Sequence, residues 1–379
     1  MNEHPQQAIA ERMLDWYQGK PRGPYTLELY PTLRCNLDCA FCDTTYRKAK
    51  RHGELSLERY RRLVVEAAEL EVARCYILGG GEPLVARSVS LELMRGLKSH
   101  EIQGILGTNG TLFSDRVVSE LVDIGWDEIH FSLDGATETV HDHLRGRKGV
   151  FRKVTETMRR FDELKQTRSR TFPRMVIHTV VTRENYLQLP DLVGLAARLG
   201  CYRVNFDALI AYRPEQEALK LSPDDRARLP DIARAALEIA ERLGVETTLD
   251  QFLETRTLAR GQMLFPPVRC HDVLHAACLN PWHHLVIHHD GRVGPCCVIS
   301  PAEHADSVRS RSLHDVWFHG NTFSELREAM VSGAMNPGCR NCSMAIISQN
   351  DAIRDWYDPL LRRLPRGPKS NDTGAGGVL

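Results

Sequence analysis

The sequence has no excess of charge of either sign. It contains 49 basic and 49 acidic residues among 379, so its formal net charge at pH 7 is zero. A chain without net charge has no long-range field that favours nucleic acid. It also lacks a long apolar run typical of a transmembrane helix, and the polar residues 1–23 do not resemble a secretory signal. These absences predict a cytoplasmic protein that binds neither nucleic acid nor a membrane.

Cysteine, in contrast, is abundant, with eleven residues. In a reducing cytoplasm, clustered cysteines are more often metal ligands or catalytic groups than disulfides. Three of them lie within eight residues, Cys35-Asn-Leu-Asp-Cys39-Ala-Phe-Cys42. A 4Fe–4S cluster normally takes four thiolates, so three would leave one iron open to another ligand. The alternative is structural zinc, which prefers four ligands in paired spacings.

Between residues 25 and 244, short apolar runs alternate with longer amphipathic ones. The short runs predict strands, because they are rich in branched and aromatic residues and are bounded by Gly, Pro or Asn. They cover 26–30, 75–79, 103–107, 128–133, 175–182 and 203–209. The longer runs predict helices, which cover 56–70, 88–98, a run from 114 to 124, 151–165, 189–199 and 224–243. Six strands, each followed by a helix, predict an α/β fold with a parallel sheet smaller than a closed eight-stranded barrel.

The three-cysteine motif, with the aromatic Phe41 before its last cysteine, resembles that of the radical S-adenosylmethionine (radical SAM) enzymes. This resemblance implies a partial (β/α)6 TIM-like barrel, in agreement with the six predicted units. It also implies that Cys35, Cys39 and Cys42 hold a 4Fe–4S cluster. S-adenosylmethionine (AdoMet) would chelate the open iron and be cleaved to methionine and a 5′-deoxyadenosyl radical.

Further segments resemble the AdoMet site of that family. The resemblance implies that Gly79-Gly80-Gly81-Glu82 receives the amino group of AdoMet, since glycine lets the backbone approach a ligand. Asn109 and Ser132 would contact the ribose and methionine portion. Arg145 resembles the arginine that pairs with the AdoMet carboxylate, a task that suits its planar fork. Each of these three residues, taken singly, has an alternative role. Asn109 could simply form a turn, Ser132 could be a hydroxyl at the end of a strand, and Arg145 could be a surface charge.

A second group of cysteines lies in the last third of the chain. Cys278 is separated by twelve residues from Gly291, which precedes Cys296, and the pair Cys339 and Cys342 follows later. This spacing resembles the SPASM domain, an auxiliary-cluster module of many radical SAM enzymes. No cysteine follows Cys342, as in the shortened form called a twitch domain, so the resemblance implies one fully ligated 4Fe–4S cluster and two clusters in all. A four-cysteine zinc site is the alternative.

The sequence also predicts the surroundings of this second group. Asp290-Gly291 favours a hairpin turn, and the pairs His283/His284 and His288/His289 are expected on the surface of that hairpin, with metal binding a minor alternative. Cys297 is expected to pack beside the cluster, although replacing Cys296 or donating a hydrogen atom to a substrate radical are open alternatives. Cys75 and Cys201 are expected in the core.

These features divide the chain into an N-terminal extension (1–24), a radical SAM core (25–243), a connector (244–269), a SPASM/twitch domain (270–345), and a C-terminal helix with a disordered tail (346–379). We expect an oxidoreductase that abstracts hydrogen from its substrate and passes an electron to the auxiliary cluster. The resemblance implies a sugar, cyclitol or aminoglycoside substrate, which is dehydrogenated or epimerised.

The alternatives are a maturase of a ribosomally made peptide and, in another class, a non-catalytic iron–sulfur or zinc scaffold. A flavodoxin- or ferredoxin-type electron donor is implied as a partner. Candidate bases and substrate anchors near the strand ends are Glu28, Asp207 and Arg213.

Overall fold

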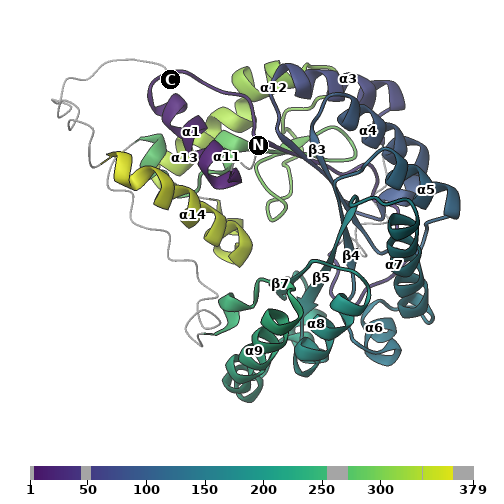
Figure 1. Cartoon of the computed structure of the whole chain (residues 1–379). Coiled ribbons are helices and arrows are strands. Elements are labelled where there is room, and N and C mark those ends of the chain that lie inside the picture. Colours follow the sequence, from purple (N-terminus) through teal and green to yellow (C-terminus); the bar gives the residue numbers. More distant parts are fainter. Residues whose placement is uncertain (1–3, 44–52, 254–271, 335, 362–379) are drawn as a thin grey trace.

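The computed structural model describes residues 4–43, 53–253, 272–334 and 336–361. The predicted α/β class and partial barrel are confirmed, since one mostly parallel sheet carries helices on its outer face (Figure 1). Its strands follow the order β7-β6-β5-β4-β3-β2-β1-β8-β9. They are β1 Thr26–Leu29, β2 Arg74–Ile77, β3 Gln103–Thr108, β4 Glu128–Ser132, β5 Arg174–Val181, β6 Arg203–Ala208, β7 Glu246–Thr247, β8 His284–Ile287 and β9 Val293–Gly294.

Helices follow each of the first six strands, as the amphipathic pattern predicts. They are α3 Leu57–Glu69, α4 Arg87–Ser99, α5 Asp115–Asp123, α6 Glu138–Leu144, α7 Val150–Thr167, α8 Leu189–Arg198 and α9 Pro223–Leu243. Ser56 caps α3, because its side chain accepts a hydrogen bond from the backbone N–H of Arg59. Short 3₁₀ helices lie in the connections: η2 Pro83–Ala86, η3 Tyr186–Gln188, η4 Pro214–Leu219, η5 Leu249–Phe252, η6 Val273–His275 and η7 Pro337–Asn341.

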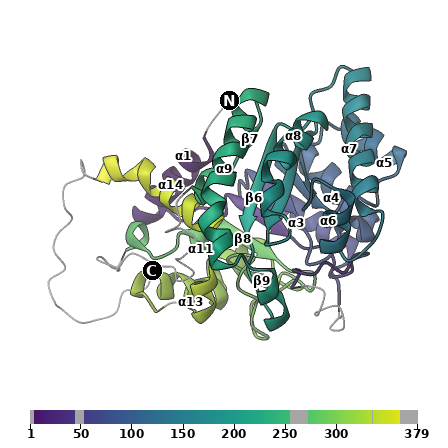
Figure 2. The ribbon, with the colours of Figure 1, turned by 90° about the horizontal axis from the view of Figure 1, so that it is seen from below.

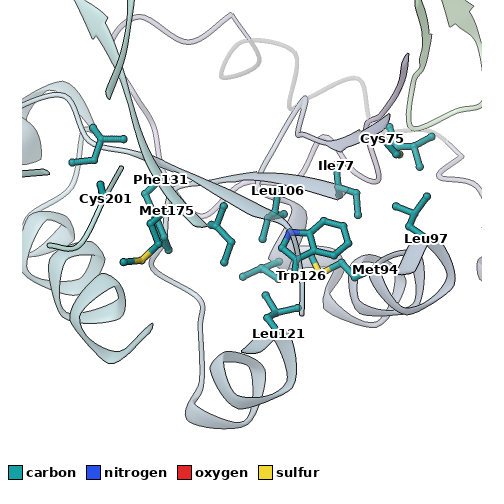
Figure 3. Close-up of a cluster of buried hydrophobic side chains, with 14 of the residues drawn as sticks. Cys75, Ile77, Met94, Leu97, Leu106, Leu121, Trp126, Phe131, Met175 and Cys201 are labelled. Carbon is teal, nitrogen blue, oxygen red and sulfur yellow. The ribbon is translucent and has the colours of Figure 1, made fainter. Parts of the chain in front are cut away.

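The main core lies between the sheet and these helices (Figure 3). Trp126 is fully buried there, and its indole N–H donates to the backbone carbonyl of Glu128 at 2.8 Å. Its ring lies so close to β3 that a Cβ atom at Gly104 would stand 2.1 Å from it, so this position requires glycine. Cys75 and Cys201 belong to the same core, which confirms the prediction for both thiols.

A second core joins the two ends of the described chain. The helix α1 Pro5–Tyr17 contacts α14 Met344–Leu361, and both views place them with α13 Asn321–Ser332, away from α5 and α7 (Figures 1 and 2). The sequence predicts residues 1–24 only as an N-terminal extension. Here α1 instead contributes apolar side chains to this core, which contains Ile9, Ala10, Met13, Leu274, Trp282, Cys339, Ile353 and Tyr357.

The last part of the sheet links the C-terminal region to the barrel. β8 pairs in parallel with β1, with Leu285 opposite Leu27, and forms the predicted hairpin with β9. Helix α11 Asn280–His283 precedes β8 and contacts it, and α12 Leu313–His319 contacts α3. β7 lies within the segment that the sequence predicts as a connector, and it extends the sheet beside β6.

No helix in the described part of the chain is long and apolar enough to cross a membrane. The disordered tail predicted at the end of the chain lies outside the described residues, as does Cys270, a cysteine that belongs to neither predicted group of cluster ligands.

Candidate active site

A cavity of about 580 Å³ lies at the carboxyl ends of the barrel strands. This is the end at which α/β barrels place their binding and catalytic groups. Its lining brings together side chains and glycines from the loop after β1 and from the ends of β2, β3 and β4. Among the residues predicted from the sequence, the cavity contains Cys35, Cys39, Cys42, Gly79, Gly80, Gly81, Glu82, Asn109, Ser132 and Arg145.

The three cysteines belong to one loop that follows β1. Cys39 is buried, while Cys35 and Cys42 are half-buried. Burial raises the pKa of the Cys39 thiol to about 11, although the nearby Arg145 guanidinium opposes that rise. The backbone N–H of Leu37 donates to the sulfur of Cys35 at 3.4 Å. The loop therefore presents three sulfur atoms to one cavity, which is the donor set that a cluster with an open iron requires.

The glycine segment after β2 lies against the backbone just before Cys35. The N–H of Gly81 donates to the carbonyl of Thr32 at 2.9 Å, and the N–H of Glu82 donates to that of Arg34 at 2.9 Å. A Cβ atom at Gly81 would stand only 2.1 Å from the Arg34 carbonyl oxygen. A side chain there would separate the glycine segment from the cysteine loop, so this close approach requires glycine.

Glu82 connects the ends of β2 and β3. Its carboxylate accepts from the hydroxyl of Thr108 at 2.8 Å and from the backbone N–H of Asn109 at 2.7 Å. Burial raises the pKa of Glu82, although these hydrogen bonds oppose the rise. Asn109 in turn donates from Nδ2 to the side-chain oxygen of Asn36 at 2.9 Å. Glu82 and Asn109, two of the residues predicted to contact AdoMet, are thus linked to each other and to Asn36 in the cysteine loop.

Arg145 follows α6 as its C-terminal cap residue and lines the same cavity. Its guanidinium forms an ion pair with Asp134, which is fully buried, and its Nη1 lies 3.6 Å from the sulfur of Cys39. Burial alone would lower the pKa of Arg145, but Asp134 and Cys39 raise it overall. Its buried Nε has no hydrogen-bond partner among the described residues. Phe41 does not line the cavity, but its ring lies 5.3 Å from the Arg145 guanidinium.

The second group of cysteines also comes together in space. Burial raises the pKa of Cys342 to about 12, and Cys278, Cys296 and Cys339 lie near enough to contribute. No three His, Cys, Asp or Glu side chains in the described ranges are arranged to hold a metal ion. Thiolates around a cluster lie farther apart than those around one ion, because each binds a different iron. Four neighbouring cysteines are the donor set of a closed cluster. Cys297 is exposed beside them.

Family models match both the barrel that forms the cavity and the C-terminal region that carries the second group of cysteines. Residues 29–193 match the radical SAM superfamily, and residues 278–343 match the SPASM iron–sulfur cluster-binding domain. The chain belongs to the radical SAM superfamily. It is a radical SAM enzyme with a C-terminal SPASM domain, and its cofactors are AdoMet, the 4Fe–4S cluster of that family and iron–sulfur bound by the SPASM domain.

Named relatives cover most of this radical SAM enzyme. The AdoMet-dependent heme synthase of Methanosarcina barkeri is 26% identical over 303 residues, which cover 78% of this chain and 83% of the relative. The PqqA peptide cyclase of Bradyrhizobium diazoefficiens is 24% identical over 324 residues, covering 84% and 78% respectively. The structure of Streptococcus suis SuiB bound to S-adenosylmethionine has the same fold, with a TM-score of 0.66, 17% identity, and coverage of 85% of this chain and 72% of SuiB.

Two histidines that no sequence motif predicts also line the cavity of the radical SAM barrel. His178 Nε2 lies 2.5 Å from Asp207 Oδ2, and both residues line the cavity. Burial alone would lower the pKa of His178, but Asp207 raises it overall. His130 also lines the cavity and lies 3.1 Å from Glu128. For His130 the available signal is the period of two along β4, where Glu128, His130 and Ser132 alternate with the fully buried Ile129 and Phe131; β5 carries no such alternation around His178.

Of the three candidate bases and anchors, Asp207 is the one that lines this cavity. Arg213 lies at the start of η4. Glu28 is buried in β1, where its carboxylate accepts from the Tyr30 hydroxyl at 2.6 Å and lies 3.1 Å from His284 Nε2.

The prediction that the four hairpin histidines lie on the surface is wrong. His283, His288 and His289 are buried, with exposed fractions of 0%, 9% and 7%. The reason is that β8 does not form an isolated hairpin with β9. Its other edge pairs with β1, so the barrel covers residues that a free hairpin would expose.

Proposed function

We propose that this radical SAM enzyme oxidises a peptide, using a 4Fe–4S cluster on Cys35, Cys39 and Cys42 and a second 4Fe–4S cluster on Cys278, Cys296, Cys339 and Cys342. The observation that carries the proposal is the shared cavity: the three sulfur atoms of the cysteine loop line the same space as Gly79–Gly81, Asn109, Ser132 and Arg145.

The residues around the cavity suit AdoMet. Gly79-Gly80-Gly81-Glu82 offers backbone and a carboxylate to the amino group, and Arg145 offers its unpartnered Nε to the carboxylate of AdoMet. Asn109 and Ser132 would hold the ribose and methionine portion. When bound, the cluster and AdoMet supply a 5′-deoxyadenosyl radical, which takes a hydrogen atom from the substrate. The barrel orients both partners and excludes water.

A peptide substrate has better support than the sugar, cyclitol or aminoglycoside expected from the sequence. Several of the relatives matched over most of their length are PqqA peptide cyclases from different bacteria. The heme synthase relative shows that the family architecture serves other substrates as well. The proposal of a peptide substrate therefore rests on the named relatives. The shared cavity supports the other part of the proposal, radical chemistry with AdoMet.

The pair His178–Asp207 is our proposed proton acceptor. About 39% of the His178 side chain and 36% of the Asp207 side chain are exposed, and both line the cavity. Once the substrate has lost one hydrogen atom, which would be recovered in 5′-deoxyadenosine, its oxidation requires the further loss of one electron and one proton. His178 would take the proton, and Asp207 would stabilise the imidazolium that results. The four C-terminal cysteines would hold the electron acceptor.

We propose the domain boundaries that the sequence predicts. They are an N-terminal extension (1–24), a radical SAM core (25–243), a connector (244–269), a SPASM/twitch domain (270–345) and a C-terminal segment (346–379). We also propose a flavodoxin- or ferredoxin-type protein as the external electron donor. A reduced donor is required because the first cluster must deliver one electron to AdoMet.

Anaerobic reconstitution tests the number of clusters. Since seven cysteines lie in suitable groups, we expect about eight irons and eight sulfides per chain. Iron, sulfide and zinc are measured together on the wild-type protein, on Cys35→Ala/Cys39→Ala/Cys42→Ala and on Cys339→Ala/Cys342→Ala. Each variant should keep about half of the iron. A wild-type protein that binds zinc alone, or that holds four irons, contradicts the two-cluster assignment.

The substrate class is tested with peptides encoded by short reading frames beside the gene. We expect reduced enzyme and AdoMet to remove a pair of hydrogens from such a peptide, detected as a mass loss that matches the amount of 5′-deoxyadenosine. Peptide made in deuterated medium should transfer deuterium to 5′-deoxyadenosine. Deuterium transfer from a labelled cyclitol or aminoglycoside, with none from any peptide, would show that the peptide proposal is wrong.

A further inference from the structure

The segment that ends α6 holds the cysteine loop at several consecutive positions. The carbonyl of Leu144 accepts from the backbone N–H of Ala40 at 2.9 Å, and Arg147 Nη1 donates to the carbonyl of Asn36 at 2.8 Å. Gly146 has a φ of +67°, and a Cβ atom there would stand 2.3 Å from the Asp38 carbonyl oxygen. The segment 144–147 therefore lies directly along the loop 36–40.

Arg145 is the member of this segment that reaches a sulfur atom. One terminal nitrogen, Nη1, lies 3.6 Å from Cys39 Sγ, and the other pairs with the Asp134 carboxylate. Asp134 is itself fixed, because its Oδ1 accepts from the backbone N–H of Val180 in β5 at 2.9 Å. Arg145 is 8% exposed and Asp134 is fully buried. The guanidinium is thus held in one place by the barrel, independently of AdoMet.

We infer that Arg145 is a positioning residue whose Nη1 donates to the Cys39 sulfur and raises the reduction potential of the cluster that this loop holds. The inference rests on the proposed assignment of Cys35, Cys39 and Cys42 to that cluster. It gives Arg145 a role beyond AdoMet binding: Nε remains for the AdoMet carboxylate, whereas Nη1 and Nη2 are used by Cys39 and Asp134.

The physical reason is charge. Reduction adds a negative charge to a cluster, and hydrogen bonds to the cysteine sulfurs are among the features that set its potential. A buried guanidinium stabilises added negative charge more than an exposed one does, because water screens it less. Arg145 is 8% exposed and paired with the fully buried Asp134, and a guanidinium keeps its charge in proteins. The ion pair with Asp134 keeps the donor aimed at the sulfur.

The test is a potentiometric titration of the reconstituted full chain without AdoMet, followed by EPR. The cluster on the three-cysteine loop is recognised as the one whose signal changes when AdoMet is then added. We expect Arg145→Gln to lower the ratio of reduced to oxidised cluster at a fixed potential about tenfold, which is about 59 mV for a one-electron couple. Arg145→Lys keeps the charge and should restore most of the wild-type potential.

The control is Arg152→Gln, which removes the same charge from an arginine whose side chain is 75% exposed and pairs with Glu138. It should leave the potential unchanged. An equal shift in Arg152→Gln, or an unchanged potential in Arg145→Gln with weakened AdoMet binding, overturns the inference. So does loss of this cluster's iron in both Arg145 variants, since Arg145 would then serve assembly. A wild-type protein without an AdoMet-responsive signal would instead refute the proposed cluster site.

Discussion

Replacement of Cys35, Cys39 or Cys42 by alanine is expected to abolish AdoMet cleavage. Each change removes one of the three thiolates that the loop after β1 presents to the cavity. A cluster that already leaves one iron open cannot keep its position with two protein ligands. We expect 5′-deoxyadenosine formation to fall more than about 100-fold, since loss of partners in the outer shell of a metal site alone typically costs 10- to 100-fold.

The measurement is 5′-deoxyadenosine released by reduced protein under anaerobic conditions, normalised to total iron. Cys201→Ala is the matched control, because it also removes a cysteine but one that lies in the main core, away from the cavity lining. The SPASM-domain cluster should survive in each single variant, so the iron content should fall by about half rather than to zero. Near-normal cleavage in any of the three variants would disprove the assignment of the loop.

Much of the site could be predicted, because its short sequence motifs lie at the ends of strands that the sequence also predicts. Cys35, Gly79 and Asn109 follow β1, β2 and β3, and Ser132 is the last residue of β4. The carboxyl ends of parallel strands meet at one end of a barrel. The apolar runs place these residues at strand ends, and the resemblance to the radical SAM family singles them out, so both together lead us to expect them in one site. The structure adds the contacts between them, such as the bond from Asn109 to Asn36.

His130 and His178 could not be assigned to the cavity in the same way. In a strand of a barrel, every second side chain points inward, but the sequence does not say whether an inward histidine faces a ligand or a packed interior. The pairing of His178 with Asp207 depends on the register of β5 against β6, in which Val180 lies opposite Asp207. That register is a tertiary property, so Asp207 could be proposed only as one of three candidate bases.

Long-range packing explains the remaining differences. The polar and charged residues of α1 predict only an N-terminal extension. In the structure, however, Ile9 and Met13 of this helix belong to the second core. The sequence predicts the histidines around β8 as surface residues, because an isolated hairpin leaves the outer edge of each strand exposed. Pairing of β8 with β1 closes that side and brings His284 to Glu28. In both cases, residues distant in sequence supply the burial.

The same pairing places the C-terminal cysteines beside the barrel. Tyr30 follows β1, and its ring lies 5.0 Å from that of His288 at the end of β8. Burial raises the pKa of Tyr30, and Cys296 and Cys297 are near enough to contribute to that rise. The second cysteine group is therefore close to the strand that leads directly into the cysteine loop. This proximity suits a cluster that exchanges electrons with a substrate in the barrel.

Removal of the second cluster is accordingly expected to separate hydrogen abstraction from product formation. Cys339→Ala/Cys342→Ala leaves the cysteine loop and the cavity lining unchanged, so the variant should still form 5′-deoxyadenosine. The substrate radical would, however, lose its electron acceptor, and oxidised peptide should fall much more than 5′-deoxyadenosine. The ratio of the two products, measured by mass spectrometry with the peptide substrate, is the decisive quantity, and Cys201→Ala should keep the wild-type ratio.

Cys339 also belongs to the second hydrophobic core, so the folding of the double variant must be checked. Its circular dichroism and the iron retained by the cysteine loop serve this purpose, and Cys342→Ala alone provides a milder variant because Cys342 is only half-buried. If either folded variant makes oxidised peptide in normal proportion to 5′-deoxyadenosine, the second cluster is structural. An epimerisation or another redox-neutral reaction would then explain the chain better, because such a reaction returns a hydrogen to the substrate and requires no electron acceptor.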